Sequence, residues 1–401
     1  MNKYFRINTL LCLNCFLLAA SVQAAEWRID PTLRFRTGYN NNITLTTQAD
    51  KPSSAEISFQ PNAKFSRDTE VSSISGTVGA NLRRFPEENG LNDDNFNFTI
   101  DAFRGLQRND FRLGLDFIKD TTLETELEST GLVFGRTDRS RQSINPDWTW
   151  RFNESTHLNA NYTYSAVDYD ANSQGYVDSR SHTAQLSLNR ALNERSTISL
   201  IANQTLTKND NNVLSRSTNL QLGYRYNLSE TISASLSAGA RKSTTKYSRD
   251  FFLAQVIPFT QQIKVDETGS VFSASVSKTV ERGRHALNLS RDIQNSISGR
   301  LIEVTTAGSD NSYRFSDRLS AALNFDYYQS HSTSDVSTIE NIDREYYTIS
   351  PGLNWKLSRL WTISSNYHFK KQTSNNSEHS AIQNSFAINL TYQWPRIAIS
   401  R

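Results

Sequence analysis

The feature that most constrains this chain is a strict alternation of apolar and polar residues, which is clearest in residues 386–394. There Phe, Ile, Leu, Tyr and Trp take every second position, and Ala, Asn, Thr and Gln lie between them. Successive side chains of a strand point to opposite faces, so this stretch predicts a strand with one apolar and one polar face. The apolar face ends in Tyr392 and Trp394, whose rings favour a membrane–water interface. By itself, the stretch fits either a half-exposed strand of a soluble sandwich or the closing strand of a transmembrane β-barrel.

The repetition of this alternation along the chain favours the barrel. Strands of the same kind are predicted at residues 27–36, 57–65, 74–82, 96–102, 111–117, 148–152, 158–164, 184–188, 220–226, 232–240, 319–327, 349–357 and 361–369. Short polar turns, such as 153–156, alternate with longer polar loops, such as 330–343. Outer-membrane barrels have short periplasmic turns and longer external loops. The sequence therefore predicts an all-β fold, an antiparallel transmembrane up-and-down β-barrel of about 18 strands, with about 16 as the alternative.

The N-terminal residues resemble a secretory signal peptide. Lys3 and Arg6 precede an apolar run at residues 10–20, and small residues follow it, which predicts cleavage after Ala24 and a barrel domain over residues 25–401. Such a signal predicts export to the outer membrane of a Gram-negative bacterium, with lipids, lipopolysaccharide and the barrel assembly machinery as partners. Both cysteines, Cys12 and Cys15, lie in the signal, so no disulfide is expected. The formal net charge of +3 gives no indication of a nucleic-acid partner.

The polar face of each predicted strand points to the lumen, because the apolar face of a membrane barrel points to lipid. The predicted lumen-lining residues are Arg34, Arg36, Arg83, Arg112, Arg151, Arg225, Arg241, Lys356, Asp30, Asp101, Asp116 and Asp326. These charges either contact a hydrated solute that passes through the barrel or pair with one another in a packed polar interior. On the lipid side, the aromatics predicted to anchor the interface are Trp355, Trp361, Tyr392 and Trp394.

Residues 247–266 are unusually apolar for an external loop, with apolar runs at 251–253 and 256–259. The segment either folds into the barrel as a constriction or extends two tall strands.

The sequence gives little sign of catalysis. The six histidines show no paired metal-ligand spacing, and a Gly-x-Ser-x-Gly motif does not occur. The prediction is a protein without a metal or cofactor that is not an enzyme. A hydrolase built from a His and a Ser of the barrel wall remains the open alternative.

Two segments carry a resemblance to a known family. Residues 27–45, with Tyr-Asn-Asn-Asn-Ile-Thr-Leu at 39–45, and the ending Leu-Thr-Tyr-Gln-Trp-Pro-Arg at 390–396 resemble porin-like outer-membrane barrels associated with exopolysaccharide gene clusters and PEP-CTERM sorting systems. The resemblance implies a role in polysaccharide export, with polysaccharide and periplasmic export components as partners. One departure is that residues 395–401 follow Trp394, whereas outer-membrane barrels usually end on an aromatic.

Three functions follow from these observations. The first is a conduit for export of an exopolysaccharide. The second is a diffusive porin for small polar solutes, and the third is a structural or surface-glycan-binding barrel without conductance.

Overall fold

The computed structural model describes residues 26–47, 51–123, 136–170, 176–253, 257–295, 301–332, 344–374 and 380–399. The predicted signal peptide lies outside them. The strands are β1 (Trp27–Asn40), β2 (Ser54–Asp68), β3 (Ser72–Arg84), β4 (Asp93–Gly105), β5 (Asn109–Thr121), β6 (Asp138–Arg151), β7 (Thr156–Tyr169), β8 (Ser179–Ala191), β9 (Ser196–Asn209), β10 (Leu214–Asn227), β11 (Ile232–Leu253), β12 (Ile257–Val280), β13 (Gly283–Asn295), β14 (Leu301–Arg314), β15 (Leu319–Ser332), β16 (Arg344–Lys356), β17 (Trp361–Ser374), β18 (Ala381–Gln393) and β19 (Ile397–Ile399).

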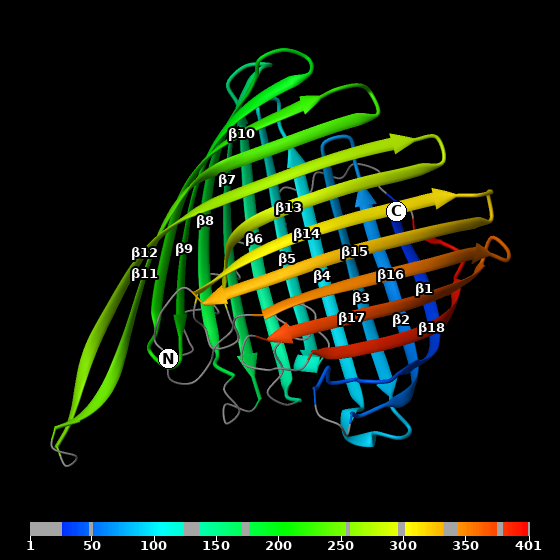
Figure 1. Ribbon diagram of the computed structural model, residues 1–401. Coiled ribbons are helices and arrows are strands. Elements are labelled where there is room, and N and C mark those ends of the chain that lie inside the picture. Colours follow the sequence, from blue (N-terminus) through cyan, green and yellow to red (C-terminus); the bar gives the residue numbers. More distant parts are fainter. Residues whose placement is uncertain are drawn as a thin grey trace.

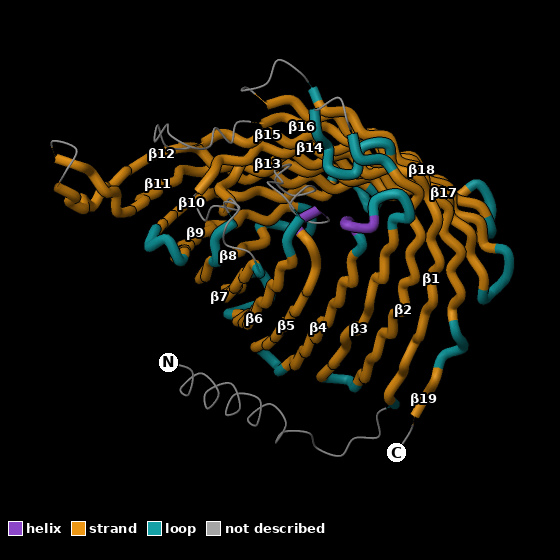
Figure 2. The backbone as a smooth tube through the Cα atoms, turned by 90° about the horizontal axis from the view of Figure 1, so that it is seen from below, coloured by secondary structure: helices purple, strands orange, loops and turns teal. Residues whose placement is uncertain are grey.

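The strands form one closed antiparallel barrel (Figures 1 and 2). Each of β1 to β17 pairs with the next strand along the chain, and β18 pairs with β1 to close the ring. The prediction of an antiparallel barrel with 18 strands is confirmed, and the alternatives of 16 strands and of a sandwich are wrong. Besides the strands, a short 3₁₀ helix at Asn89–Leu91 lies between β3 and β4. In the described parts of the chain, no helix has the length and apolar character needed to cross a bilayer.

The outer face of the barrel is apolar and exposed. Alternate residues leave large apolar side chains uncovered in the middle of many strands, and Leu220, Leu222 and Leu287 are 55%, 58% and 58% exposed. A soluble monomer rarely exposes a contiguous apolar patch beyond a few hundred Å². A continuous band of such residues around a barrel whose backbone groups are paired identifies a membrane-spanning β-barrel.

The short turns are stabilised by one recurring contact, a polar side chain that accepts hydrogen bonds from backbone N–H groups further along. The Asn193 Oδ1 atom accepts from the N–H groups of Arg195 and Ser196, each at 2.9 Å. The Ser358 hydroxyl accepts from the N–H groups of Leu360 and Trp361, each at 3.2 Å. These contacts satisfy donors that the strand ladder leaves unpaired, which is why Asn and Ser recur at this end of the barrel.

The residues after Trp394 extend the closing strand. Pro395 has no N–H and interrupts the ladder, after which β19 pairs with the start of β1, Ile397 opposite Ile29. The Arg396 guanidinium donates to both carboxylate oxygens of Asp30, at 2.7 and 3.0 Å. This hydrogen-bonded pair raises the pKa of Arg396 above its ordinary value. The barrel is therefore closed by β18 and β19 together.

The apolar segment at 247–266 forms the tip of a tall hairpin. β11 and β12 stay paired up to Leu253 opposite Ile257, and the hairpin extends past its neighbours (Figure 1). The alternative of a constriction folded into the barrel is therefore wrong, because residues 247–253 and 257–266 are paired in the ladder between two tall strands.

The alternation of faces gives a direct test of the lipid-facing band. We expect Leu220→Lys to destabilise the folded barrel by about 2–4 kcal/mol, the cost of a lysine near the bilayer midplane on a lipid-facing position. The matched control is Gln221→Lys. Residue 221 points to the lumen, where the charge of the introduced lysine stays hydrated. Unfolding by denaturant in phospholipid vesicles measures both, and equal costs would contradict the assignment of the two faces.

Candidate functional site

The lumen contains a polar cavity of about 760 Å³. Its walls come from β1 to β4 on one side of the β1–β18 junction and from β13 to β18 on the other. Charges of both signs line it, namely Arg36, Glu56, Arg83, Asp93, Asp310, Asp326, His368 and Lys370. An even mixture of this kind offers many hydrogen-bond partners without a strong field of one sign.

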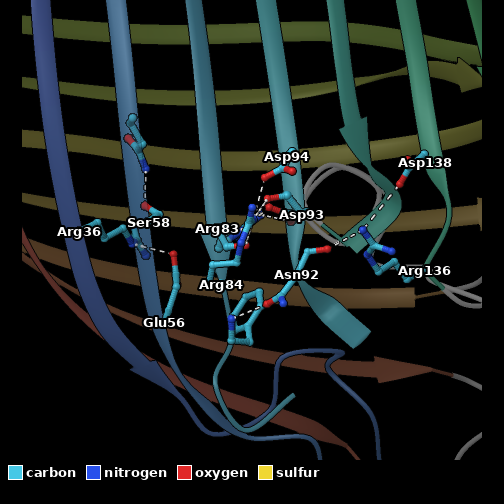
Figure 3. Close-up of polar contacts among 12 residues, drawn as sticks. Arg36, Glu56, Ser58, Arg83, Arg84, Asn92, Asp93, Asp94, Arg136 and Asp138 are labelled. Atoms are coloured by element: carbon cyan, nitrogen blue, oxygen red, sulfur yellow. Dashed lines mark hydrogen bonds and ion pairs between the residues drawn. The ribbon is translucent and has the colours of Figure 1, made fainter. Parts of the chain in front are cut away.

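On the β1–β4 side, the charges form close ion pairs (Figure 3). Arg36 lies 3.1 Å from Glu56. Arg83 donates to both oxygens of Asp93, at 3.2 and 2.9 Å, and the Asp93 side chain is 2% exposed. A planar guanidinium fits a carboxylate in this two-bond manner, which fixes the orientation of both side chains. These pairs stiffen one wall of the cavity.

On the β15–β17 side, the polar groups have mixed partners. The His368 Nδ1 atom lies 2.8 Å from the Ser350 hydroxyl. The Lys370 ammonium lies 5.2 Å from the centre of the Tyr346 ring, which is a cation–π contact. Asp326 lines the cavity as well. This wall presents a carboxylate, an imidazole and an ammonium beside an aromatic face.

Two loops fold over the edge of the cavity. In the β1–β2 loop, Asn42 is fully buried, and its side-chain amide donates a hydrogen bond to the Ile382 carbonyl at 3.0 Å. The neighbouring Ile43 lines the cavity. In the β3–β4 loop, Glu87 accepts a hydrogen bond from the Ser54 hydroxyl, and this bond lowers the pKa of Glu87 below its ordinary value. Both loops are therefore held by specific polar contacts.

The lumen face from β8 to β12 is rich in hydroxyl groups. Between β11 and β12, inward serines pair directly across the strands, with Oγ–Oγ distances of 2.8, 2.7 and 2.8 Å for Ser233–Ser277, Ser235–Ser275 and Ser237–Ser273. Between β8 and β9, the Thr183 and Thr205 hydroxyls lie 3.1 Å apart. The lumen thus has a charged wall around the large cavity and a hydroxyl-rich wall from β8 to β12.

The residues predicted from the sequence to line the lumen lie at several separate places in the barrel. Arg36, Arg83 and Asp326 line the large cavity. Asp101 and Arg112 line a second hollow of about 330 Å³. The remaining contacts are Arg34 with Thr391 at 3.4 Å, Asp116 with Ser143 at 2.9 Å, Arg151 with Asp110, Arg241 with Glu303 at 2.7 Å, and Asp30 with Arg396. Arg225 and Lys356 are exposed near the short-turn ends of β10 and β16.

The sequence analysis missed several residues of the cavity, among them Glu56, Asp93, Asp310, His368 and Lys370. Glu56 and Lys370 continue the inward parity of strands that were predicted, so extending the alternation by a residue or two would have found them. Asp310 lies in β14, where the alternation is weak. Asp93 begins β4, three residues before the strand predicted at 96–102.

Three of the four aromatics predicted to anchor the interface form a cluster at the short-turn end of the barrel. The rings of Trp361 and Tyr392 lie 4.7 Å apart, and those of Tyr392 and Trp394 lie 5.6 Å apart in an edge-to-face arrangement. Trp355 is 53% exposed. In the part of the chain that the structure describes, no group of three or more His, Cys, Asp or Glu could hold a metal ion.

No family model and no curated protein matches the sequence. The fold is similar to those of solved outer-membrane barrels. OmpT of Vibrio cholerae with its loop L8 deleted is 12% identical, with a TM-score of 0.44 over 93% of this chain and 100% of that one. OccAB2 of Acinetobacter baumannii is 10% identical, with a TM-score of 0.47 over 92% and 98%. The open form of Fiu, the ferric-catecholate import receptor of E. coli K12, is 8% identical, with a TM-score of 0.49 over 93% and 82%. These likenesses concern the fold alone.

The prediction that the chain is not an enzyme is corrected. It rested on the absence of linear catalytic motifs from the sequence. In a barrel, side chains from separate strands meet in the lumen without any fixed spacing along the chain. The absence of a motif therefore does not exclude catalysis, and the statement is withdrawn.

Ion pairs in the barrel wall differ in burial, which predicts very different costs of breaking them. Arg139 and Asp120 form a two-bond pair whose side chains are 5% and 3% exposed. Asp120→Asn leaves the buried guanidinium without this carboxylate, so we expect it to lower the free energy of unfolding by about 3–5 kcal/mol. The control is Asp94→Asn, because the Arg84–Asp94 pair is about half exposed and its loss is expected to cost less than about 1 kcal/mol. Unfolding free energies of the two variants in vesicles decide this, and similar costs would contradict the burial argument.

Proposed function

We propose that this outer-membrane-type barrel is a conduit through which a secreted polysaccharide crosses the outer membrane of a Gram-negative bacterium. The observation that carries the proposal is the composition of the lumen, where a wall of paired charges faces a wall of hydroxyl groups. A glycan chain carries many hydroxyls that both donate and accept hydrogen bonds. Closely spaced Ser and Thr hydroxyls let it exchange one partner for the next.

The even mixture of charges suits a long polar cargo. Conduction requires binding that is favourable enough for entry and weak enough for release. In the cavity, Arg83 is held by Asp93 and Arg36 by Glu56, so each guanidinium keeps only part of its donors for a passing solute. Weak contacts repeated along the wall support movement rather than retention.

The partners and the location form part of the same proposal. The segment 1–24 acts as the secretory signal, the barrel assembly machinery inserts the protein, and lipid and lipopolysaccharide surround its apolar band. Periplasmic export components deliver the polymer to the short-turn end.

A diffusive porin for small polar solutes is the second candidate function. The inward-folded β1–β2 loop favours it, because Ile43 lines the cavity and Asn42 holds the loop against β18. A narrowed lumen sorts small solutes by size.

Secretion in a deletion strain tests the proposal. We expect loss of the secreted polysaccharide and its accumulation inside the cell, both reversed by the complementing gene. Unchanged secretion would overturn the conduit, and the conductance of the purified protein in a planar bilayer would then distinguish a porin, which conducts steadily, from a structural or glycan-binding barrel, which does not.

A pair of adjacent substitutions tests the hydroxyl wall. Ser235 points to the lumen and bonds to Ser275, whereas Leu236 is 56% exposed on the lipid face. We expect Ser235→Phe to narrow the lumen and reduce both secretion and conductance, and Leu236→Phe to leave both unchanged. A comparison of the two variants at equal amounts in the outer membrane gives the result, and equal behaviour would argue against transport along this wall.

A further inference from the structure

The barrel wall has an interrupted ladder between β12 and β13. Their pairing ends at Phe272 opposite Arg291, although β12 continues to Ile257 and β13 to Asn295. Within the described residues, no pairing joins 257–271 of β12 to 292–295 of β13. We call the stretch over which β12 and β13 are not paired with each other the seam. It lies towards the long loops, whereas the short-turn end of the same two strands is fully paired.

One ion pair joins the strands on either side of the seam. Arg241 is on the lumen face of β11, and its Nη1 atom donates to the Ser243 hydroxyl at 3.3 Å. Its Nη2 atom donates to Glu303 of β14 at 2.7 Å. Glu303 lies opposite Ile293, on the outward parity of β13 and β14. The pair therefore joins an inward position of β11 to an outward position of β14, and the Arg241 side chain is 3% exposed.

A glycine makes this contact possible. Gly269 of β12 is directly opposite Arg241, and a Cβ atom at this position would lie 2.4 Å from the Arg241 Nη2 atom. Any other side chain would displace the guanidinium. On the outer side, Glu303 also lies 3.6 Å from Arg291, whose guanidinium is above the Phe272 ring at 5.8 Å. Arg241, Glu303 and Arg291 thus close the seam with charge where the backbone ladder does not.

The inward face near the seam combines apolar side chains with the carboxylate of Asp292, which is opposite Val304. Ile302, Val304, Tyr328 and Tyr346 form a buried cluster there, and Val271 at the edge of β12 is 1% exposed. The rings of Tyr328 and Tyr346 stack at 4.8 Å, and both residues line the large cavity. A path of apolar side chains therefore leads from the seam to the cavity. On the outside, the apolar band reaches the seam at Phe272 and Leu289.

We propose that the seam is a lateral portal by which the acyl chain of an amphiphile passes between the outer leaflet and the lumen, with the Arg241–Glu303 pair as its latch. The continuity of the lipid-facing band with the inner apolar cluster identifies the occupant, because an acyl chain is the ligand that both surfaces accept. The mixed charges of the cavity receive the polar head. Because no backbone hydrogen bonds join the described residues of β12 to those of β13 along the seam, only side-chain contacts have to separate for the portal to open.

Quenching by brominated lipid tests the portal in the full-length chain, with Cys12→Ser and Cys15→Ser to remove its two cysteines. A bimane fluorophore is attached to T306C, the next inward-facing position of β14 after Val304. In the control it is attached to S199C, on the lumen face of β9 in the far wall. The vesicles contain phosphatidylcholine with dibrominated acyl chains. We expect quenching at position 306 and none at position 199. Equal quenching at both positions, or none at position 306, would overturn the portal.

The latch is tested in the same assay. R241Q and G269A both remove the guanidinium from Glu303 and are expected to increase quenching at position 306. The matched control is G308A, where a Cβ atom would come no closer than 3.5 Å to its neighbours and no increase is expected. Should R241Q fail to fold, as judged by circular dichroism, E303Q breaks the same pair from the other side. Unchanged quenching in the folded latch variants would overturn the latch.

Discussion

Backbone hydrogen bonding in an apolar solvent is the constraint on which this structure depends. A bilayer offers no partners to N–H and C=O groups, so strands can cross it only when each is paired on both sides. The β1–β18 pairing meets this requirement, and β19 continues it past Pro395. Once the ring is closed, the alternation of side chains assigns every second residue to lipid and the others to the lumen.

The same constraint explains where charge can be placed. Arginines and carboxylates are tolerated on the inner face because they remain hydrated or pair with one another, as in Arg83–Asp93. The hydroxyl pairs between β11 and β12 satisfy their own hydrogen bonds across the strands. A polar interior of this kind is stable without a packed apolar core, which leaves room for a solute. At the seam the ladder is incomplete, and there a charge network and buried apolar side chains take its place.

Much of the fold was predictable because the period-two pattern is local. The strand at 386–394, the short turns with Asn193 and Ser358, and the number of strands all follow from neighbouring residues. The segment 247–266 left two possibilities open, because an apolar run does not reveal whether it extends a hairpin or turns inwards; pairing with the opposite strand decided this. The withdrawn statement on enzymatic activity shows a related weakness, since residues that meet across a lumen leave no spacing in the sequence.

The sequence by itself determined the architecture and the two faces of each strand, because both depend on the alternation of adjacent residues. It also placed charges such as Arg36, Arg83 and Asp326 on the inner face. Only the tertiary structure decided which of these share the cavity and with which partners, because they come from strands up to hundreds of residues apart that ring closure brings together. It alone revealed the seam, where the register of β12 and β13 ends before the strands do and Gly269 lets Arg241 reach Glu303.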